Sequence, residues 1–150
     1  MKHNHTAVRS TDDLMKRIAD ATEGPMTVLR ETEPFMTLPP LHEYLNELIE
    51  ERHETPQRVF EKIGLERTMG HRIMAGSRQP SRNVLIRLAF ELALTLEETQ
   101  NLLQIGGKAV LYPRVRRDNL LIYALTHTMS IEEIEAQLQA LGEKSLYLRC

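Results

Sequence analysis

Apolar residues recur every three or four positions along most of this chain, which predicts a protein built from short amphipathic helices. The stretch 41–54 shows the pattern, because Leu41, Leu45 and Leu48 share one helical face while glutamates occupy the other faces. Further helices are predicted over 56–63, 67–75, 82–94 and 96–105, together with a helical hairpin over 117–142. We therefore expect an all-α fold.

The first 40 residues are expected to form an appendage to this helical body. A short helix begins after Ser10, whose hydroxyl can cap it, and fades by Gly24 and Pro25. Residues 26–40 contain three more prolines and are predicted to form an extended arm. The apolar residues of this arm would pack on the main domain, on a second subunit or on another protein partner.

Residues 55–81 predict two short helices joined by a tight turn. Thr55 can cap the first helix with its hydroxyl, and Pro56 suits the first helical position. Gly64 allows the left-handed backbone conformation with which such a helix ends, so the chain can reverse and start again near Arg67. A second glycine and then a proline end the second helix after residue 75.

The second of these helices, 67–75, has an apolar side and a polar side. Met69, Ile73 and Met74 are predicted to face the protein interior. The other side would present four polar side chains to solvent: Arg67, Thr68, His71 and Arg72. A helix fits the major groove of DNA, where an arginine can bond two acceptors on guanine and a threonine methyl group can touch thymine. This side of the helix therefore has chemistry that suits DNA.

Positive charge is concentrated around the same pair of helices. The chain has a formal net charge of −2, but the stretch from Thr55 to Arg87 contains seven basic and two acidic residues, a local balance of +5. Attraction to phosphates is the main sequence-independent source of affinity for DNA. The charge distribution thus favours the same interpretation.

The spacing of Gly64, Ile73, Gly76 and Pro80-Ser81 resembles that of the lambda-repressor-like (XRE) helix-turn-helix regulators of bacteria and phages. The resemblance covers roughly residues 41–105. It implies five helices, with 67–75 as the recognition helix, and a function as a sequence-specific DNA-binding transcriptional regulator. Such proteins bind double-stranded DNA as homodimers, on half-sites about one helical turn, roughly 34 Å, apart.

The candidate DNA contacts lie on and around the helix 67–75. Those expected at base edges are Arg67, Thr68, His71 and Arg72. Those expected nearer the phosphates are Thr55, Gln57, Ser77 and Arg78, and the candidate set also includes Arg58 and Gln79. Glu66 has two interpretations, since its carboxylate can accept from a cytosine amino group or simply favour the positive end of the helix.

A second helical hairpin is predicted because the sequence repeats itself. A shift of 35 residues aligns similar residues: Arg82 with Arg117, Thr95 with Ser130, each opening a capping box, and Gly107 with Gly142. We expect 117–142 to stack beside 82–107, because neither hairpin can bury its apolar face alone. The predicted organisation is an N-terminal helix and arm (1–40), a helix-turn-helix domain (41–107) and a C-terminal helical hairpin packed on it (108–150).

Three arginines, Arg114, Arg116 and Arg117, lie in the link between the two hairpins. They can reach DNA phosphates beside the half-site, where they would add affinity without reading sequence. They can equally bond carbonyl groups or acids at helix ends. The sequence leaves both interpretations open.

Composition argues against other classes of function. The only cysteine, Cys150, is terminal, so structural disulfides and cysteine-based metal sites are excluded, and His3 and His5 are expected to be solvated rather than metal-bound. We find no catalytic motif and no cofactor-binding motif, so no catalytic residue, cofactor or metal is expected. No apolar run approaches the length of a membrane span and no signal-peptide pattern follows the start, so a cytoplasmic protein is expected.

The alternative function is a protein-interaction module on a helix-turn-helix scaffold that does not read DNA. Two departures from the family pattern motivate it: Pro56 where a phosphate-binding glutamine is common, and Gly70 where a buried aliphatic residue is usual. The acidic net charge is a further argument for it. For the DNA-binding function, the second hairpin or the N-terminal arm would supply the dimer interface; the alternative is that the apolar residues of the hairpin belong to the core.

Overall fold

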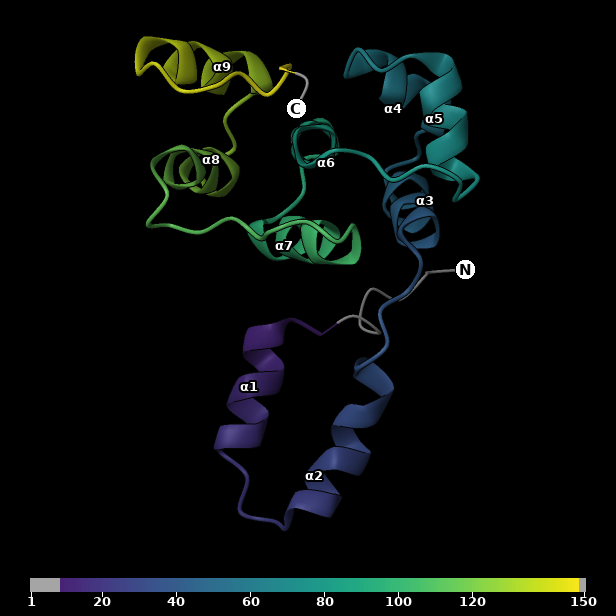
Figure 1. Ribbon diagram of the computed structural model, residues 1–150, viewed down its shortest axis with the longest axis vertical. Helices are drawn as coiled ribbons and strands as arrows, with labels where there is room; N and C mark the ends of the chain where they lie inside the picture. The colour runs from purple at the N-terminus through teal and green to yellow at the C-terminus, as the bar shows by residue number, and fades with distance from the viewer. Residues whose placement is uncertain (1–8, 149–150) are drawn as a thin grey trace. The chain divides into compact units, whose positions relative to one another are not determined.

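The computed structural model describes residues 9–148, and all regular structure in this range is helical (Figure 1). The all-α fold class is therefore confirmed. The chain divides into two compact units, Met1–Pro39 and Pro40–Cys150, here called the small and the large unit. The small unit contains α1 (Thr11–Ala19), α2 (Pro25–Thr32) and a short 3-10 turn (Glu33–Phe35). The large unit contains α3 (Leu41–Glu51), α4 (Pro56–Lys62), α5 (Arg67–Met74), α6 (Arg82–Glu91), α7 (Leu96–Ile105), α8 (Arg116–Thr126) and α9 (Ile131–Ala140).

The small unit contains a second helix where an extended arm was predicted, so that prediction is wrong. α1 begins as expected, with the Ser10 hydroxyl accepting from the Asp13 N–H at 3.1 Å. Pro25 does not end a helix but occupies the first position of α2. A backbone N–H at this position would make no hydrogen bond within the helix, so proline loses nothing there, and its fixed φ suits a helix. Near the end of α2, the buried hydroxyl of Thr32 donates to the Val28 carbonyl at 2.9 Å. The prolines were therefore misread as breakers of a segment that one of them begins.

α6 forms the centre of the large unit. All seven residues from Asn83 to Ala89 are buried, and the helix packs against α4, α7 and α9. Figure 1 shows it end-on with other helices of the unit around it. A helix that is covered on most sides needs few polar residues, and this buried stretch contains only two, Asn83 and Arg87. It ends at Glu91, earlier than the predicted 94, because the chain turns at Ala93 with a positive φ of 50°.

The predicted internal repeat is present in the structure. α9 begins and ends 35 residues after α7 begins and ends. α8 likewise ends 35 residues after α6 ends, and its start differs from the same shift by one residue. The positions at which the backbone takes positive φ repeat as well: Ala93 with Thr128, at 50° and 56°, and Gly107 with Gly142, at 70° and 71°. The two hairpins are therefore copies in backbone conformation as well as in sequence.

Each hairpin is closed by the arginine at its start. Arg82 donates to the carbonyl groups of Ala109 and Val110, at 2.9 and 3.1 Å, in the segment that follows α7. Arg117 donates in the same way to Lys144 and Ser145, at 3.0 and 3.4 Å, in the segment that follows α9.

The same two arginines join the hairpins to each other. Arg82 forms an ion pair with the carboxylate of Asp118 at 2.9 Å, and Arg117 donates to the side-chain oxygen of Asn83 at 2.8 Å. Asn83 and Asp118 are equivalent positions of the repeat, so the cross-links are reciprocal. The hairpins therefore stack through directed polar bonds as well as through apolar packing.

The outer positions of the second hairpin are polar. Val84 and Leu102 are buried in the first hairpin, whereas their counterparts, Asn119 and Gln137, are exposed. Terminal repeats with a polar outer face are typical of stacked helical repeats.

The predicted caps of the two hairpins differ. Thr95 and Glu98 form a complete capping box, with bonds of 3.1 and 3.0 Å. The Ser130 hydroxyl accepts from the Glu133 N–H at 3.1 Å, but among residues 9–148 no return bond is found from the Ser130 N–H to the Glu133 carboxylate. The box predicted at Ser130 is therefore only half formed, because the exposed Glu133 side chain stays in solvent.

No helix within the described range is both long enough and apolar enough to cross a membrane.

Replacing Arg82 by alanine should lower the free energy of unfolding by about 2–4 kcal/mol, because the buried carboxylate of Asp118 would lose its counter-ion. Arg114→Ala removes an exposed arginine from the link between the hairpins and should change the free energy of unfolding by less than about 0.5 kcal/mol. Urea unfolding followed by circular dichroism measures both values. Equal effects of the two substitutions would contradict the role given to Arg82.

Candidate nucleic-acid interface

α4 and α5 are the two helices predicted within 55–75, and a glycine turn joins them. The Thr55 hydroxyl caps α4 by accepting from the Arg58 N–H at 3.4 Å, and Pro56 fills the first helical position. After α4 the backbone turns at Gly64, which has a φ of 73°. The next N–H, that of Leu65, reaches back to the carbonyl of Phe60 at 2.9 Å. This pattern satisfies the end of α4 and redirects the chain into α5.

α5 is anchored along one side and open along the other. Gly70 and Ile73 are buried, while Met69 and Met74 are half-buried, and the helix packs against α3 and α4. The four polar side chains predicted to face outward are all exposed: Arg67, Thr68, His71 and Arg72. The helix therefore presents a continuous polar side that its own unit does not cover.

At Gly70, α5 packs tightly against α4. A Cβ atom at this position would lie 2.9 Å from Cδ2 and 3.2 Å from Cγ of Phe60, closer than side chains normally approach. Phe60 is itself buried, so its ring has little room to move. The Phe60 ring thus fills the space that the side chain of a buried aliphatic residue at position 70 would occupy. Sequence reasoning noted the glycine as unusual but missed Phe60 as its partner.

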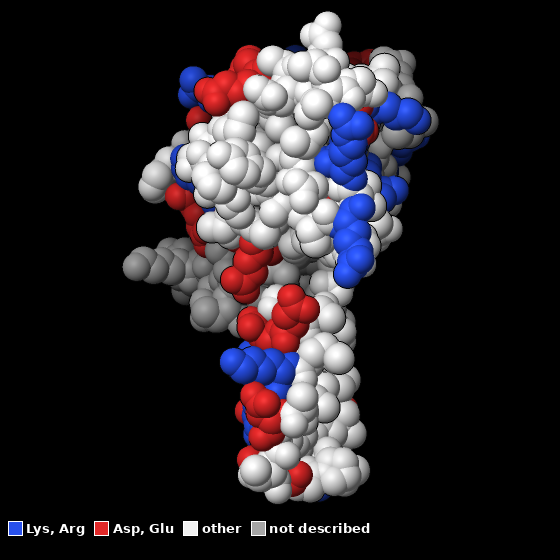
Figure 2. Space-filling model, turned by 90° about the vertical axis from the view of Figure 1, so that its left-hand side faces the viewer, with Lys and Arg blue, Asp and Glu red and all other residues white. Residues whose placement is uncertain are grey.

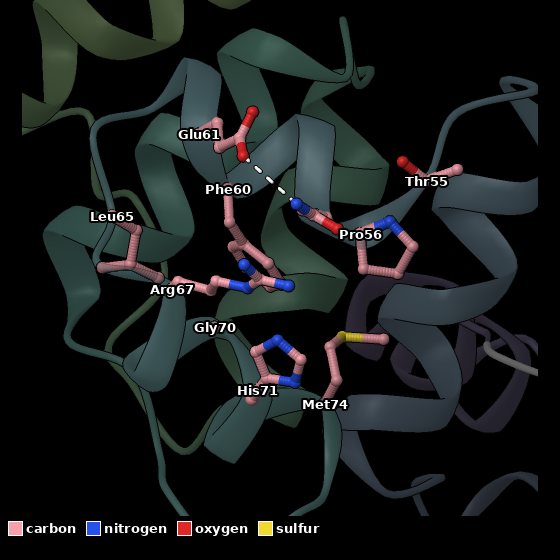
Figure 3. A pocket seen from close by; sticks show the side chains of 10 residues that line it. Thr55, Pro56, Phe60, Glu61, Leu65, Arg67, Gly70, His71 and Met74 are labelled. Atoms are coloured by element: carbon pink, nitrogen blue, oxygen red, sulfur yellow. Dashed lines mark hydrogen bonds between the residues drawn. The ribbon is translucent and has the colours of Figure 1, made fainter.

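A pocket of about 450 Å³ lies between the exposed parts of α4 and α5. Its lining combines candidate contact residues with apolar ones: Thr55, Pro56, Gln57, Phe60, Glu61, Leu65, Arg67, Gly70, His71 and Met74. Figure 3 shows Arg67, His71 and Met74 projecting from α5 toward the space beside Phe60. The structure therefore brings Thr55, Gln57, Arg67 and His71 together around one concavity. Of these lining residues, the apolar Phe60 and Leu65 were not anticipated as part of the surface.

The remaining candidate contacts are exposed but lie outside this pocket: Arg58, Glu66, Thr68, Arg72, Ser77, Arg78 and Gln79. Ser77 donates its hydroxyl to the Arg72 carbonyl at 3.2 Å, which ties the loop after α5 to the end of the helix. That loop begins at Gly76, where φ is 78° and an added Cβ would lie 3.0 Å from Nδ1 of His42. Gly76 is thus required both by its backbone conformation and by the close approach of α3.

Gln57 is already engaged within α4. Its side-chain amide donates to the Glu61 carboxylate at 3.4 Å, along the dashed line in Figure 3. A long, exposed bond of this kind is weak, so the amide remains available to a stronger acceptor such as a phosphate oxygen.

Some of the basic residues between Thr55 and Arg87 form ion pairs with acidic residues of the same chain or are buried. Lys62 pairs with Glu54 and Glu91, at 3.3 and 3.5 Å, and Arg82 pairs with Asp118. Arg87 is buried. The exposed basic residues left on and around α4 and α5 are Arg58, Arg67, Arg72 and Arg78. The local balance counted from the sequence therefore overstates the charge that faces solvent.

Arg87 supports the helix pair from behind. It donates to the carbonyl of Ile63, at the end of α4, at 2.8 Å, and its guanidinium lies 4.6 Å from the centre of the Tyr147 ring. A cation at the carboxyl end of a helix is favourable, and the ring partly replaces water around the charge. Burial nonetheless lowers the pKa of Arg87 from its usual value.

The arginines of the link are mainly structural. Arg117 bonds carbonyl groups and Asn83, as described above, and Arg116 donates to the Leu141 carbonyl at 3.3 Å and lies 3.5 Å from Glu143. Arg114 is exposed. On the face of the large unit that α8 and α9 form, basic side chains gather along one edge and acidic side chains along the other (Figure 2). For Arg116 and Arg117, bonding at helix ends is therefore the better supported interpretation.

Among residues 9–148 no three histidine, cysteine, aspartate or glutamate side chains come together in a way that would hold a metal ion. The histidines and the cysteine considered from the sequence, His3, His5 and Cys150, lie outside the described residues.

Comparisons with known proteins find no match: no family model, no curated protein and no solved structure is similar to this chain.

Gly70→Ala should lower the free energy of unfolding by about 1–3 kcal/mol, although alanine is normally the better helix former by about 1 kcal/mol. The physical reason is the overlap of the new methyl group with the Phe60 ring. Thermal or urea unfolding measures the change.

The double variant Phe60→Leu with Gly70→Ala tests the same contact. Removing the ring makes room for the methyl group, so alanine at position 70 should cost less in this background than in the wild type. Strictly additive effects would show that the two residues do not compete for one space.

Proposed function

We propose that this chain is a lambda-repressor-like (XRE) helix-turn-helix protein that reads the major groove of DNA with α5 and acts as a sequence-specific transcriptional regulator. The observation that carries the proposal is the two-sided character of α5. Gly70 and Ile73 fix the helix against its neighbours, while Arg67, Thr68, His71 and Arg72 are exposed. A rigid helix with exposed donors is the element that reads base edges in the major groove.

The order of helices supports the assignment. α3 to α7 are five helices over 41–105, and the short pair α4–α5 is joined by a glycine turn at the place where the family has its helix-turn-helix. Gly76 and Pro80 end α5 at the family's spacing, and Ser81 caps the following helix.

The roles of the contact residues follow from their positions. Arg67, Thr68, His71 and Arg72 would meet base edges because they share the outer side of α5. Thr55, Gln57, Ser77 and Arg78 would lie nearer the phosphates, because they occupy the start of α4 and the loop after α5. Arg58 and Gln79 flank these positions. Four exposed arginines give a modest electrostatic footprint, so two copies on a palindromic site are needed for tight binding.

A second function is supported by the pocket beside α5. Phe60, Leu65 and Met74 give it an apolar lining, which a side chain of a protein partner can fill. In that case the helix pair would be a protein-interaction module that does not read DNA. The two functions differ in how binding responds to salt.

Affinity for random duplex DNA should fall steeply as salt rises, because each phosphate contact releases a counterion. Arg78→Ala should reduce the slope of log affinity against log salt by about one, through the loss of one phosphate contact. Lys144→Ala is the control, because Lys144 is an exposed basic residue of the second hairpin to which no DNA contact is assigned, and it should leave the slope unchanged. Fluorescence anisotropy with a labelled duplex provides the measurement. If Arg67→Ala and Arg78→Ala both bind like the wild type, the proposed function is wrong.

A further inference from the structure

The small unit has an ionic side and an apolar side. On the ionic side Arg17 of α1 pairs with Glu23 at 2.9 Å and with Glu31 of α2 at 2.7 Å. These two pairs hold the guanidinium across the gap between the helices and keep its charge on one side of the hairpin. Figure 2 shows the small unit edge-on, with charged side chains along one side and uncharged side chains along the other.

The apolar side carries a row of large side chains. Successive residues are about 100° apart on a helix, so Met26 and Leu29 point away from Glu31 on α2, and Met15 points away from Arg17 on α1. Ile18 is about 100° from Arg17 and lies beside Met15, one turn further along α1. Met36 follows directly after the 3-10 turn. These five side chains are between 39% and 63% exposed: Met15, Ile18, Met26, Leu29 and Met36.

The hairpin cannot be stable with this side open to water. Its helices contain nine and eight residues, and isolated helices of that length are marginal in water. Only Val28 and Thr32 are buried in these helices, so the hairpin has almost no core of its own. Its stability must come from a surface that covers the apolar row.

We propose that the partner is a second copy of this chain, whose hairpin packs on the first through the same apolar row and forms a four-helix bundle around a two-fold axis. Such an interface is self-complementary, since apolar residues meet apolar residues and the charged groups stay on the outer sides. Four antiparallel helices around a shared apolar core are a common stable arrangement.

The size of the apolar row fits a weak dimer. Five side chains of this size and exposure contribute on the order of 500 Å² per copy, or about 1,000 Å² for the pair, which is the lower limit for specific interfaces. The exposed large apolar side chains of the described part of the large unit are instead spread over several segments, namely the link between the hairpins, α8, the end of α9 and the last described residues. The apolar row of the small unit is therefore the surface most suited to pairing two copies.

The inference adds to the proposed function by naming the surface that pairs two DNA-reading helices, but its test needs no DNA. Sedimentation equilibrium of the full chain should give a dimer at hundreds of micromolar and dissociation at low micromolar concentrations. Ile18→Lys and Leu29→Lys should each remain monomeric over the same range. Thr27→Lys is the matched control, because Thr27 is exposed on the Glu31 side of α2 and should leave the dimer intact.

A wild-type protein that stays monomeric at hundreds of micromolar would overturn the inference. So would loss of the dimer in Thr27→Lys, or an intact dimer in both face variants. Circular dichroism of the same samples should show lower helix content in the monomeric variants, because an uncovered hairpin loses its helices. A dimer that fails to bind DNA would contradict the proposed function and leave this inference standing.

Discussion

The close approach of Phe60 and Gly70 determines how α4 and α5 lie against each other. Because no Cβ fits between them, the position of α5 is fixed by an aromatic ring rather than by an aliphatic side chain of its own. At the end of α4, three residues after Phe60, Arg87 bonds the Ile63 carbonyl and lies over the ring of Tyr147. A residue from the end of the described chain thus supports the turn between α4 and α5. The second hairpin is accordingly part of the same body as the helix pair that is proposed to read DNA.

Arginines serve two purposes in this molecule, and burial separates them. Arg82, Arg87 and Arg117 bond carbonyl groups at the ends of helices and of hairpins. In Arg82 and Arg117 the planar guanidinium, with its several N–H groups, satisfies more than one acceptor. Arg67, Arg72 and Arg78 are exposed on and after α5. The chain has a net charge of −2, so the positive surface offered to a phosphate backbone is local and small. This agrees with a requirement for two copies on one site.

Helical periodicity and caps predicted the large unit well, because these signals are local. Thr55, Ser81 and Thr95 begin helices as expected, and Gly64 and Gly107 end them, since cap chemistry depends on a few neighbouring residues. The 35-residue repeat also emerged from the sequence, as did the exposure of the polar side of α5. The function of that side remains a prediction.

The features that the sequence did not predict depend on contacts between residues that are far apart in the chain. Pro25 is indistinguishable in sequence from a helix breaker, because a proline that begins a helix looks the same as one that ends it. The burial of Arg87 and the match of Phe60 with Gly70 require neighbours that only the folded chain brings together. The apolar row of the small unit was visible as scattered methionines and leucines, but without α2 it could not be recognised as one side of a hairpin.

Sequencing of the duplexes that the purified protein selects from a random pool tests the central claim most directly. If α5 reads the major groove, the selected DNA contains a palindromic consensus. The variant with Thr68→Ala and His71→Ala would then change the preferred bases at symmetric positions without abolishing recovery of DNA. Recovery of unselected sequence by the wild-type protein, or an identical consensus for the variant, would contradict the claim.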